Sequence, residues 1–212
     1  KQIIANRLEK LDKIRQLGVN PYPYEFNVTC STSDINKDSV DKKVSVAGRV
    51  MSLRKMGKAA FANIQDANGR VQLYIARDDV GEENYNLFKL VDIGDFIGID
   101  GIVFITKTDA LTVKAEKVTV LSKNLRPIPD VKEKDGEKYN SVSDKELRYR
   151  KRYIDMIINP ETKDNYIKRF KIINSIREFL NKNGYIEVET PVLQPVYGGA
   201  NAKPFKTFHK LG

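Results

Sequence analysis

The strongest constraint on the fold lies between Val44 and Leu121, where short runs of alternating apolar and polar residues replace the helical spacing found on either side. The third run follows Asp66-Ala67-Asn68-Gly69, and Asn-Gly accepts the positive φ angles of a tight hairpin turn. Residues 82–90 then have an apolar side at helical spacing, and two further alternating runs cover 95–106 and 111–121. The segment therefore predicts three strands, a short helix and two more strands.

This order is that of the OB-fold, a five-stranded barrel, although another small β-barrel or a sandwich would give a similar pattern. Single-stranded nucleic acids bind OB-folds on the face to which Arg54, Phe61 and Gln72 would belong, on or beside the first three strands. Phenylalanine can stack on a base there, arginine can contact phosphate, and glutamine can pair with a base edge. The alternative is that Phe61 is a core residue and the other two are ordinary solvated strand residues.

Helices are predicted before and after the barrel segment in the sequence. Apolar residues recur every three or four positions over 3–17, and Gly18 stands where a left-handed C-cap is expected. A second apolar face runs over 161–183, with Gly184 as its C-cap, and a strand over 185–189 follows it. A capping box, Ser143-x-x-Glu146, precedes this helical part of the chain.

Residues 123–143, between these parts, contain prolines and many charged residues, which indicates a linker. We therefore expect an α+β chain with a helix plus barrel over 1–122, a linker over 123–143 and the start of a second domain over 144–212. A long helix and one strand cannot close a sheet of their own, so we expect the chain to be a piece of a longer protein.

Composition excludes several classes of protein. No apolar run reaches the ~18–20 residues of a membrane span, and no signal-peptide pattern opens the chain. Cys30 and His209 are the only cysteine and histidine, which excludes an internal disulfide and a His/Cys zinc site and favours the cytoplasm. The net charge of +9 favours a polyanionic partner, although the barrel segment is neutral and many lysine-rich soluble proteins carry such a charge.

Two further patterns are weak. Glu187 and Glu189 would share one face of a strand as an acid pair or as metal ligands, but such pairs are usually solvated. Gly198-Gly199 is similar to a phosphate loop and lacks the Gly-Lys-Ser/Thr that would follow.

Several short blocks in a fixed order resemble the class II lysyl-tRNA synthetases of the bacterial/eukaryotic type. The blocks are Gly18-Val19-Asn20-Pro21-Tyr22-Pro23, Val46-Ala47-Gly48-Arg49, Met56-Gly57-Lys58-Ala59, Gly69-Arg70-Val71-Gln72-Leu73-Tyr74, Leu125-Arg126-Pro127, Arg148-Tyr149-Arg150-Lys151-Arg152-Tyr153-Ile154-Asp155, residues 179–191 and Gly198-Gly199-Ala200-Asn201-Ala202-Lys203-Pro204-Phe205. Aspartyl- and asparaginyl-tRNA synthetases share the barrel and the first class II motif. The block at 56–59 and the block at 198–205 favour the lysine family.

The resemblance implies that Arg54, Phe61 and Gln72 recognise the central uridine of the tRNA(Lys) anticodon. It implies that Gly198 and Gly199 lie beside bound lysine, and that the motif 1 residues Phe170, Ile173, Phe179 and Pro191 form a homodimer interface. Lysine, ATP and Mg²⁺ would serve the whole enzyme, which forms lysyl-adenylate.

The motif 2 and motif 3 arginines and the later acidic residues are not in this sequence. We therefore expect this chain to be inactive alone, with no catalytic residue, no metal ligand and no bound cofactor. A family glutamate near the anticodon has Lys117 in its place, after Glu116, which leaves that contact open.

Two other functions remain open. A general single-stranded nucleic-acid module with a dimerising C-terminal segment predicts sequence-tolerant binding. A protein-interaction scaffold predicts no salt-dependent RNA binding.

Overall fold

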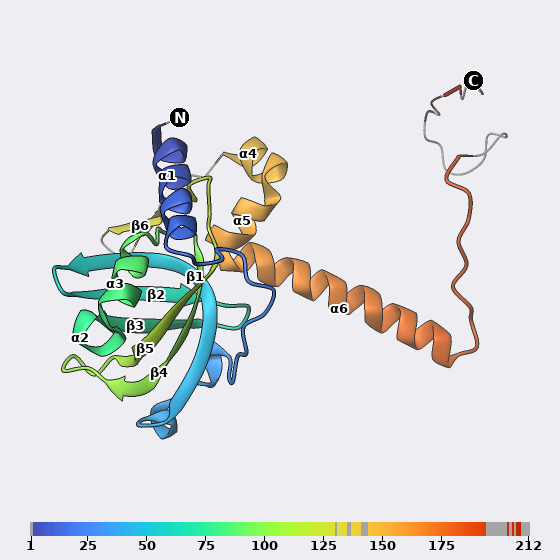
Figure 1. Cartoon of the computed structure of the whole chain (residues 1–212). Coiled ribbons are helices and arrows are strands. Elements are labelled where there is room, and N and C mark those ends of the chain that lie inside the picture. The colour runs from blue at the N-terminus through green and yellow to red at the C-terminus, as the bar shows by residue number, and fades with distance from the viewer. Residues whose placement is uncertain are drawn as a thin grey trace. The chain divides into compact units, whose positions relative to one another are not determined.

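The computed structural model describes residues 2–129, 131–134, 137–140 and 144–193, together with 203, 205, 207 and 208. The chain divides into two compact units, Lys1–Ser141 and Val142–Gly212 (Figure 1). Within the described residues, no helix combines the length and apolar character needed to cross a membrane.

The first unit contains a closed five-stranded barrel. Its strands are β1 (Lys43–Met56), β2 (Ala59–Gln65), β3 (Arg70–Ala76), β4 (Phe96–Ile105) and β5 (Leu111–Ser122), in the order β1-β2-β3-β5-β4. The pairing of β3 with β5 is parallel and the others are antiparallel. Two short helices, α2 (Arg77–Val80) and α3 (Glu82–Lys89), connect β3 to β4. The predicted OB-fold is confirmed, and the closed barrel excludes a sandwich.

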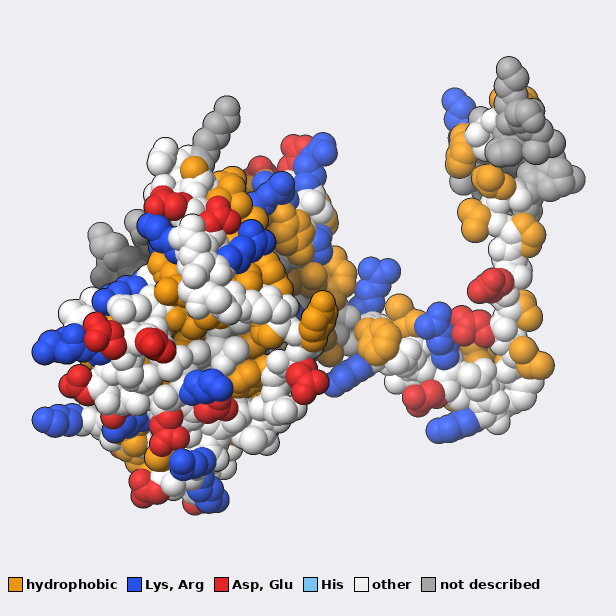
Figure 2. Space-filling model, in the orientation of Figure 1, with side chains coloured by type: hydrophobic (Ala, Val, Ile, Leu, Met, Phe, Trp, Pro, Cys, Tyr) orange, Lys and Arg blue, Asp and Glu red, His pale blue; other side chains and the backbone are white. Residues whose placement is uncertain are grey.

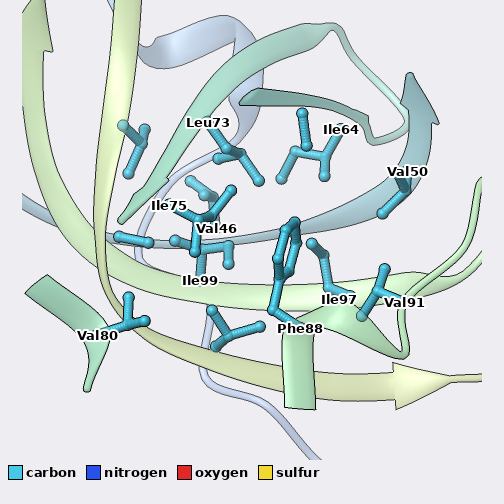
Figure 3. Close-up of a cluster of buried hydrophobic side chains, with 14 of the residues drawn as sticks. Val46, Val50, Ile64, Leu73, Ile75, Val80, Phe88, Val91, Ile97 and Ile99 are labelled. Carbon is cyan, nitrogen blue, oxygen red and sulfur yellow. The ribbon is translucent and has the colours of Figure 1, made fainter. Parts of the chain in front are cut away.

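The barrel forms because alternate residues of each strand face inward. On β2, Ala60, Ala62 and Ile64 are buried, whereas Phe61 and Asn63 between them are partly exposed. Figure 3 shows Phe88 of α3 pointing into the cluster that the inward strand side chains form. The members of this cluster include Val46, Val50, Leu73, Ile75, Ile97 and Ile99.

The predicted turn between β2 and β3 is present, but neither Asn68 nor Gly69 has the positive φ angle that was expected, and Asp66 holds the turn instead. One carboxylate oxygen accepts the backbone N–H groups of Asn68 and Gly69, each at 2.8 Å, and the other accepts that of Thr32 at 2.7 Å. Burial raises the pKa of Asp66, but these bonds and that from the Thr32 hydroxyl outweigh it, so the pKa lies well below its ordinary value. The turn is thereby tied to the short 3₁₀ helix Thr32–Asp34.

Helix α1 (Gln2–Gln16) ends as predicted, because Gly18 has φ +74° and the Val19 N–H donates to the carbonyl of Ile14. Its predicted apolar face is only partly correct. Leu11 and Ile14 are buried, whereas Ile3, Ile4, Leu8 and Leu17 are exposed. Arg7 is buried with Leu11 and Ile14, because its guanidinium donates to the carbonyls of Ile93 and Asn124.

A buried ion cluster lies where β5 ends. The side chain of Lys123 is fully buried, and its Nζ lies 2.6 Å from a carboxylate oxygen of both Asp92 and Asp95 and 2.9 Å from the carbonyl oxygen of Leu90. Lys10 of α1 also pairs with Asp92. Burial raises the pKa of Asp92, but the hydrogen bonds and charges of Lys10 and Lys123 outweigh it and hold this pKa low. The cluster fastens α1 and the end of β5 to the loop before β4.

The predicted linker contains a small hairpin that the sequence pattern did not indicate. Strands β6 (Val131–Lys134) and β7 (Glu137–Asn140) pair antiparallel, with Lys134 opposite Glu137. The apolar alternation that normally identifies a strand is weak in this charged segment, so local composition predicted only a connector.

The second unit contains α4 (Lys145–Arg150), α5 (Arg152–Ile158) and the long helix α6 (Pro160–Lys182). The predicted α6 and its C-cap are confirmed, since Gly184 has φ +82° and the Tyr185 N–H donates to the carbonyl of Leu180. The predicted N-cap of α4 is wrong: Asp144 is the N-cap, and its carboxylate accepts the Glu146 N–H at 3.0 Å. Ser143, the predicted N-cap, lies outside the described residues.

The strand predicted over 185–189 is not formed. Residues 185–190 carry no strand assignment, and in the described part of the chain no strand pairs with them. A strand needs a hydrogen-bonded neighbour, so alternation of Ile186 and Val188 with glutamates is not sufficient by itself.

Candidate nucleic-acid interface

The three residues predicted to read a base come together on the outer surface of β1–β3. Arg54 of β1 lies opposite Phe61 of β2, and Gln72 of β3 lies opposite Asn63 of β2. All three line one groove of about 520 Å³. The other lining residues are Ser52, Leu53, Met56, Asn63, Thr106 and Thr108. The groove therefore lies over the first three strands (Figure 1), beside the connection from β4 to β5.

Phe61 is a surface aromatic residue. It is partly exposed while its neighbours Ala60 and Ala62 are buried, which excludes the interpretation that it belongs to the core. Its ring packs against Tyr74 of β3, with centroids 5.1 Å apart and planes tilted by 51°. Tyr74 in turn meets the ring of Phe104 edge-on at 6.1 Å. This aromatic row holds the Phe61 ring in the wall of the groove, ready to receive a planar group.

Arg54 is an exposed cation without an internal partner. In the part of the chain that the structure describes, its guanidinium makes no hydrogen bond and no ion pair. The adjacent Lys55 is engaged, because its Nζ donates to the carbonyls of Lys89 and Val91. The N–H groups of Arg54 are thus free to contact a phosphate or a base carbonyl.

Gln72 has one end of its amide occupied and one end open. Its Oε1 accepts a hydrogen bond of 2.8 Å from the hydroxyl of Thr112 on β5. Among the described residues, no group accepts a hydrogen bond from its Nε2. The nearby Asn63 amide is occupied differently, since its Nδ2 donates to Ser52 at 2.8 Å. Gln72 can therefore donate to a ligand in the groove without breaking an internal contact.

The groove combines an aromatic surface, a free amide donor and a free cation. These are the groups that bind an unpaired base by stacking, by its edge and by its phosphate. The residues that line the groove include no His, Cys, Asp, Glu or Lys that could act as a general acid, a general base or a strong nucleophile. Across the described residues, no cluster of three or more His, Cys, Asp or Glu side chains could hold a metal ion.

Two residues that contact the groove side chains from behind were not singled out from the sequence. Tyr74 supports Phe61, and Thr112 is fully buried behind Gln72. Tyr74 could have been found from the sequence, because it lies two residues after Gln72 and therefore on the same face of the strand. Thr112 could not, because it faces Gln72 only through the parallel pairing of β3 with β5. Glu116 and Lys117 are not among the residues that line the groove, and Glu116 pairs with Lys43 at 3.4 Å.

For the other predicted sites, the structure shows no comparable grouping of side chains among the described residues. Gly198 and Gly199 lie outside the described residues. Phe170, Ile173, Phe179 and Pro191 are all exposed, and Figure 2 shows apolar side chains uncovered along α6. Glu187 pairs with Arg177 at 3.0 Å. This ion pair fits the solvated interpretation of Glu187 better than a metal site.

The arginine-rich block before α6 is organised by Asp155, which is fully buried. Its carboxylate accepts hydrogen bonds from Arg148 at 2.9 Å, Arg152 at 2.8 Å and Asn159 at 2.6 Å. Burial raises the pKa of Asp155, but the bonds from Asn159 and Arg148 and the charges of both arginines outweigh it. Two of the basic side chains in this block are thus structural partners of Asp155.

Comparison with known proteins gives the same division of the chain. A family model described as an OB-fold nucleic acid binding domain matches residues 44–121, and one described as tRNA synthetases class II (D, K and N) matches 144–212. A lysine–tRNA ligase of Azobacteroides pseudotrichonymphae genomovar. CFP2 is 50% identical over 214 aligned residues, which cover 96% of this chain and 43% of that protein. A lysine–tRNA ligase of Porphyromonas gingivalis is 47% identical over 216 residues, which cover 96% and 37%.

The chain therefore spans about two-fifths of the length of these curated relatives. The matches extend over both units, and the barrel of the first unit agrees with the OB-fold description. The chain belongs to the class II lysyl-tRNA synthetase family, of which it carries the OB-fold domain and part of the synthetase domain.

Proposed function

We propose that the barrel reads the central uridine of the tRNA(Lys) anticodon and that Arg54, Phe61 and Gln72 make the contacts. The observation that carries this proposal is the convergence of these three side chains on one groove. The names of the relatives support lysine and its tRNA as the substrates of the whole protein.

The contacts follow from the chemistry of each side chain. The uracil ring stacks on Phe61, which Tyr74 holds in place. The open Nε2 of Gln72 donates to a uracil carbonyl oxygen, and Arg54 neutralises a neighbouring phosphate. Base–aromatic stacking contributes ~1–3 kcal/mol. A paired base edge contributes a similar discrimination of ~1–3 kcal/mol, by analogy with DNA readout.

The barrel would serve an enzyme that joins lysine to tRNA(Lys) through lysyl-adenylate, with ATP and Mg²⁺, in the cytoplasm. In that enzyme Gly198 and Gly199 would lie beside the bound lysine. The exposed apolar residues Phe170, Ile173 and Phe179 on α6, with Pro191 after it, would form a homodimer interface. An unpartnered apolar helix face of this kind is typical of a surface that is covered in an assembly.

The second candidate is a general single-stranded nucleic-acid module. The aromatic row of Phe61, Tyr74 and Phe104 favours it, because stacking accepts any base. The two candidates differ in what Gln72 does. A general module would lose little when this amide is removed, whereas an anticodon reader would lose its choice of base.

The test is an equilibrium titration of labelled anticodon stem-loops at fixed salt. One loop carries UUU and the other UCU, and the proteins are the wild type, Gln72→Ala and the matched control Gln65→Ala, whose glutamine instead accepts from Arg70. We expect the wild type and the control to prefer UUU by about tenfold or more, and Gln72→Ala to lose the preference. Equal binding of both loops by the wild type would refute the proposal.

A further inference from the structure

Among the described residues, the hydroxyl of Thr112 is a buried polar group that contacts Gln72, one of the side chains proposed to read the base. Thr112 is fully buried and lies directly opposite Gln72 in the parallel pairing of β3 with β5. Its Oγ1 lies 2.8 Å from the Oε1 of Gln72 and 3.1 Å from the carbonyl oxygen of Ala110. The Thr112 backbone is part of the barrel wall, so its hydroxyl is held by a rigid strand.

A hydroxyl has one proton, so Thr112 can satisfy Gln72 in two ways. When the proton goes to Gln72, Oε1 faces Thr112 and Nε2 faces the groove. When the proton goes to the carbonyl of Ala110, the amide must turn over, donate its own N–H to Oγ1 and present Oε1 to the groove. In the structure Oε1 of Gln72 faces the Thr112 hydroxyl, which is the first arrangement.

The two arrangements select different pyrimidines. Uracil carries a carbonyl at C4, which accepts from Nε2, and its N3–H can reach the second lone pair of Oε1. Cytosine carries an amino group at C4 and an acceptor at N3, so it would oppose a donor to a donor and an acceptor to an acceptor. The turned amide would instead accept from the cytosine amino group.

We propose that Thr112 is a positioning residue that sets the direction of the Gln72 amide and thereby the preference for a 4-keto over a 4-amino pyrimidine. This inference rests on the proposed function, because it assigns the origin of the base preference at the same groove. Thr112 does not need to touch the RNA. Its hydroxyl acts through one hydrogen bond to a side chain that does.

The test uses the whole chain and the same UUU and UCU stem-loops. Thr112→Val keeps the shape and removes the hydroxyl, Thr112→Ser keeps the hydroxyl, and Thr119→Val makes the same change on β5 outside the groove lining. We expect the ratio of UUU to UCU affinity to fall from about tenfold to within about threefold in Thr112→Val. Thr112→Ser and Thr119→Val should keep the wild-type ratio.

The ratio separates positioning from a purely structural role, because loss of folded protein weakens both loops equally. If Thr112→Val folds poorly, Thr112→Ala gives the same comparison with a smaller side chain. A wild-type ratio in both hydroxyl-free variants would overturn the inference. Failure of the proposed function looks different: the wild type itself would show no preference, or Gln72→Ala would leave the preference intact.

Discussion

Replacing Lys123 by methionine gives the sharpest test of what holds the barrel together. Methionine keeps most of the apolar stem and removes the ammonium group that contacts Asp92, Asp95 and the carbonyl of Leu90. Asp92 would keep Lys10 as a partner. Asp95 is fully buried and would keep two backbone N–H donors, from Asp92 and Asn124, but among the described residues it would have no ion pair, although the charges of Arg49 and Lys55 act on it.

The magnitude follows from this imbalance. Removing one partner of a buried ion pair costs ~3–5 kcal/mol, because the remaining charge is left uncompensated. The two backbone donors to Asp95 reduce the loss, so we expect the lower end of that range, about 3 kcal/mol. Lys43→Met is the matched control, since the lysine side chain is 78% exposed in its pair with Glu116. A surface pair of this kind contributes less than ~1 kcal/mol.

Urea unfolding combined with hydrogen exchange measures the effect in the full chain. Exchange of peptides from β4 and β5 reports the opening of the barrel separately from the second unit. A loss in Lys123→Met no larger than that in Lys43→Met would refute the reasoning. The cluster would then contribute no net stability, and the contacts of Arg7 and the buried apolar residues would account for the docking of α1.

Three further predictions concern the groove, the turn and helix α6. Phe61→Ala should weaken UUU and UCU stem-loops alike, by ~1–3 kcal/mol, while Phe61→Tyr keeps the stack; titration of both loops measures this, and a selective loss of one loop would contradict it. The lowered pKa of Asp66 means that its ionised form stabilises the fold above the ordinary carboxyl pKa, and that this stability is lost as the pH falls through about 4 and below. Urea titrations should therefore show Asp66→Asn destabilised at neutral pH, with the difference from the wild type shrinking in acid; a constant difference would contradict the assignment. Phe179→Asp should reduce self-association in sedimentation, whereas Ile3→Asp, at an apolar position of similar exposure on α1, should not; equal effects would argue against a dimer through α6.

The barrel was predictable because its signals are local. Strand alternation has a period of two, and the glycine C-caps depend on the φ angles of single residues. The turn after Asp66 forms where it was predicted, but through the hydrogen bonds of the Asp66 carboxylate and without a positive φ at Asn68 or Gly69. The structure confirms the strand order, the turn at Asp66 and the caps at Gly18 and Gly184. The grouping of Arg54, Phe61 and Gln72 followed from the fold, because neighbouring strands bring outward residues of similar height together. Their role in base recognition stays a prediction.

The errors arose where distant segments decide the outcome. The buried face of α1 includes Arg7, which the apolar pattern did not predict. Its guanidinium donates to the carbonyls of Ile93 and Asn124, which lie far along the chain. The strand predicted over 185–189 had the right alternation but no described neighbour to pair with. The local sequence pattern contains no information about a distant hydrogen-bond acceptor or about whether a neighbouring strand is present.

The sequence by itself determined the barrel strands, the helices α1, α3 and α6, the family and the three candidate groove residues, because periodicity, turn chemistry and ordered motifs are local features of the chain. Only the tertiary structure decided how those residues are held. The parallel pairing of β3 with β5 sets Thr112 behind Gln72, and the β2–β3 pairing sets Tyr74 against Phe61. The closure of the barrel joins strands that are far apart in the sequence. It brings the hydroxyl of Thr112 to the amide of Gln72, and the direction of that amide depends on this contact.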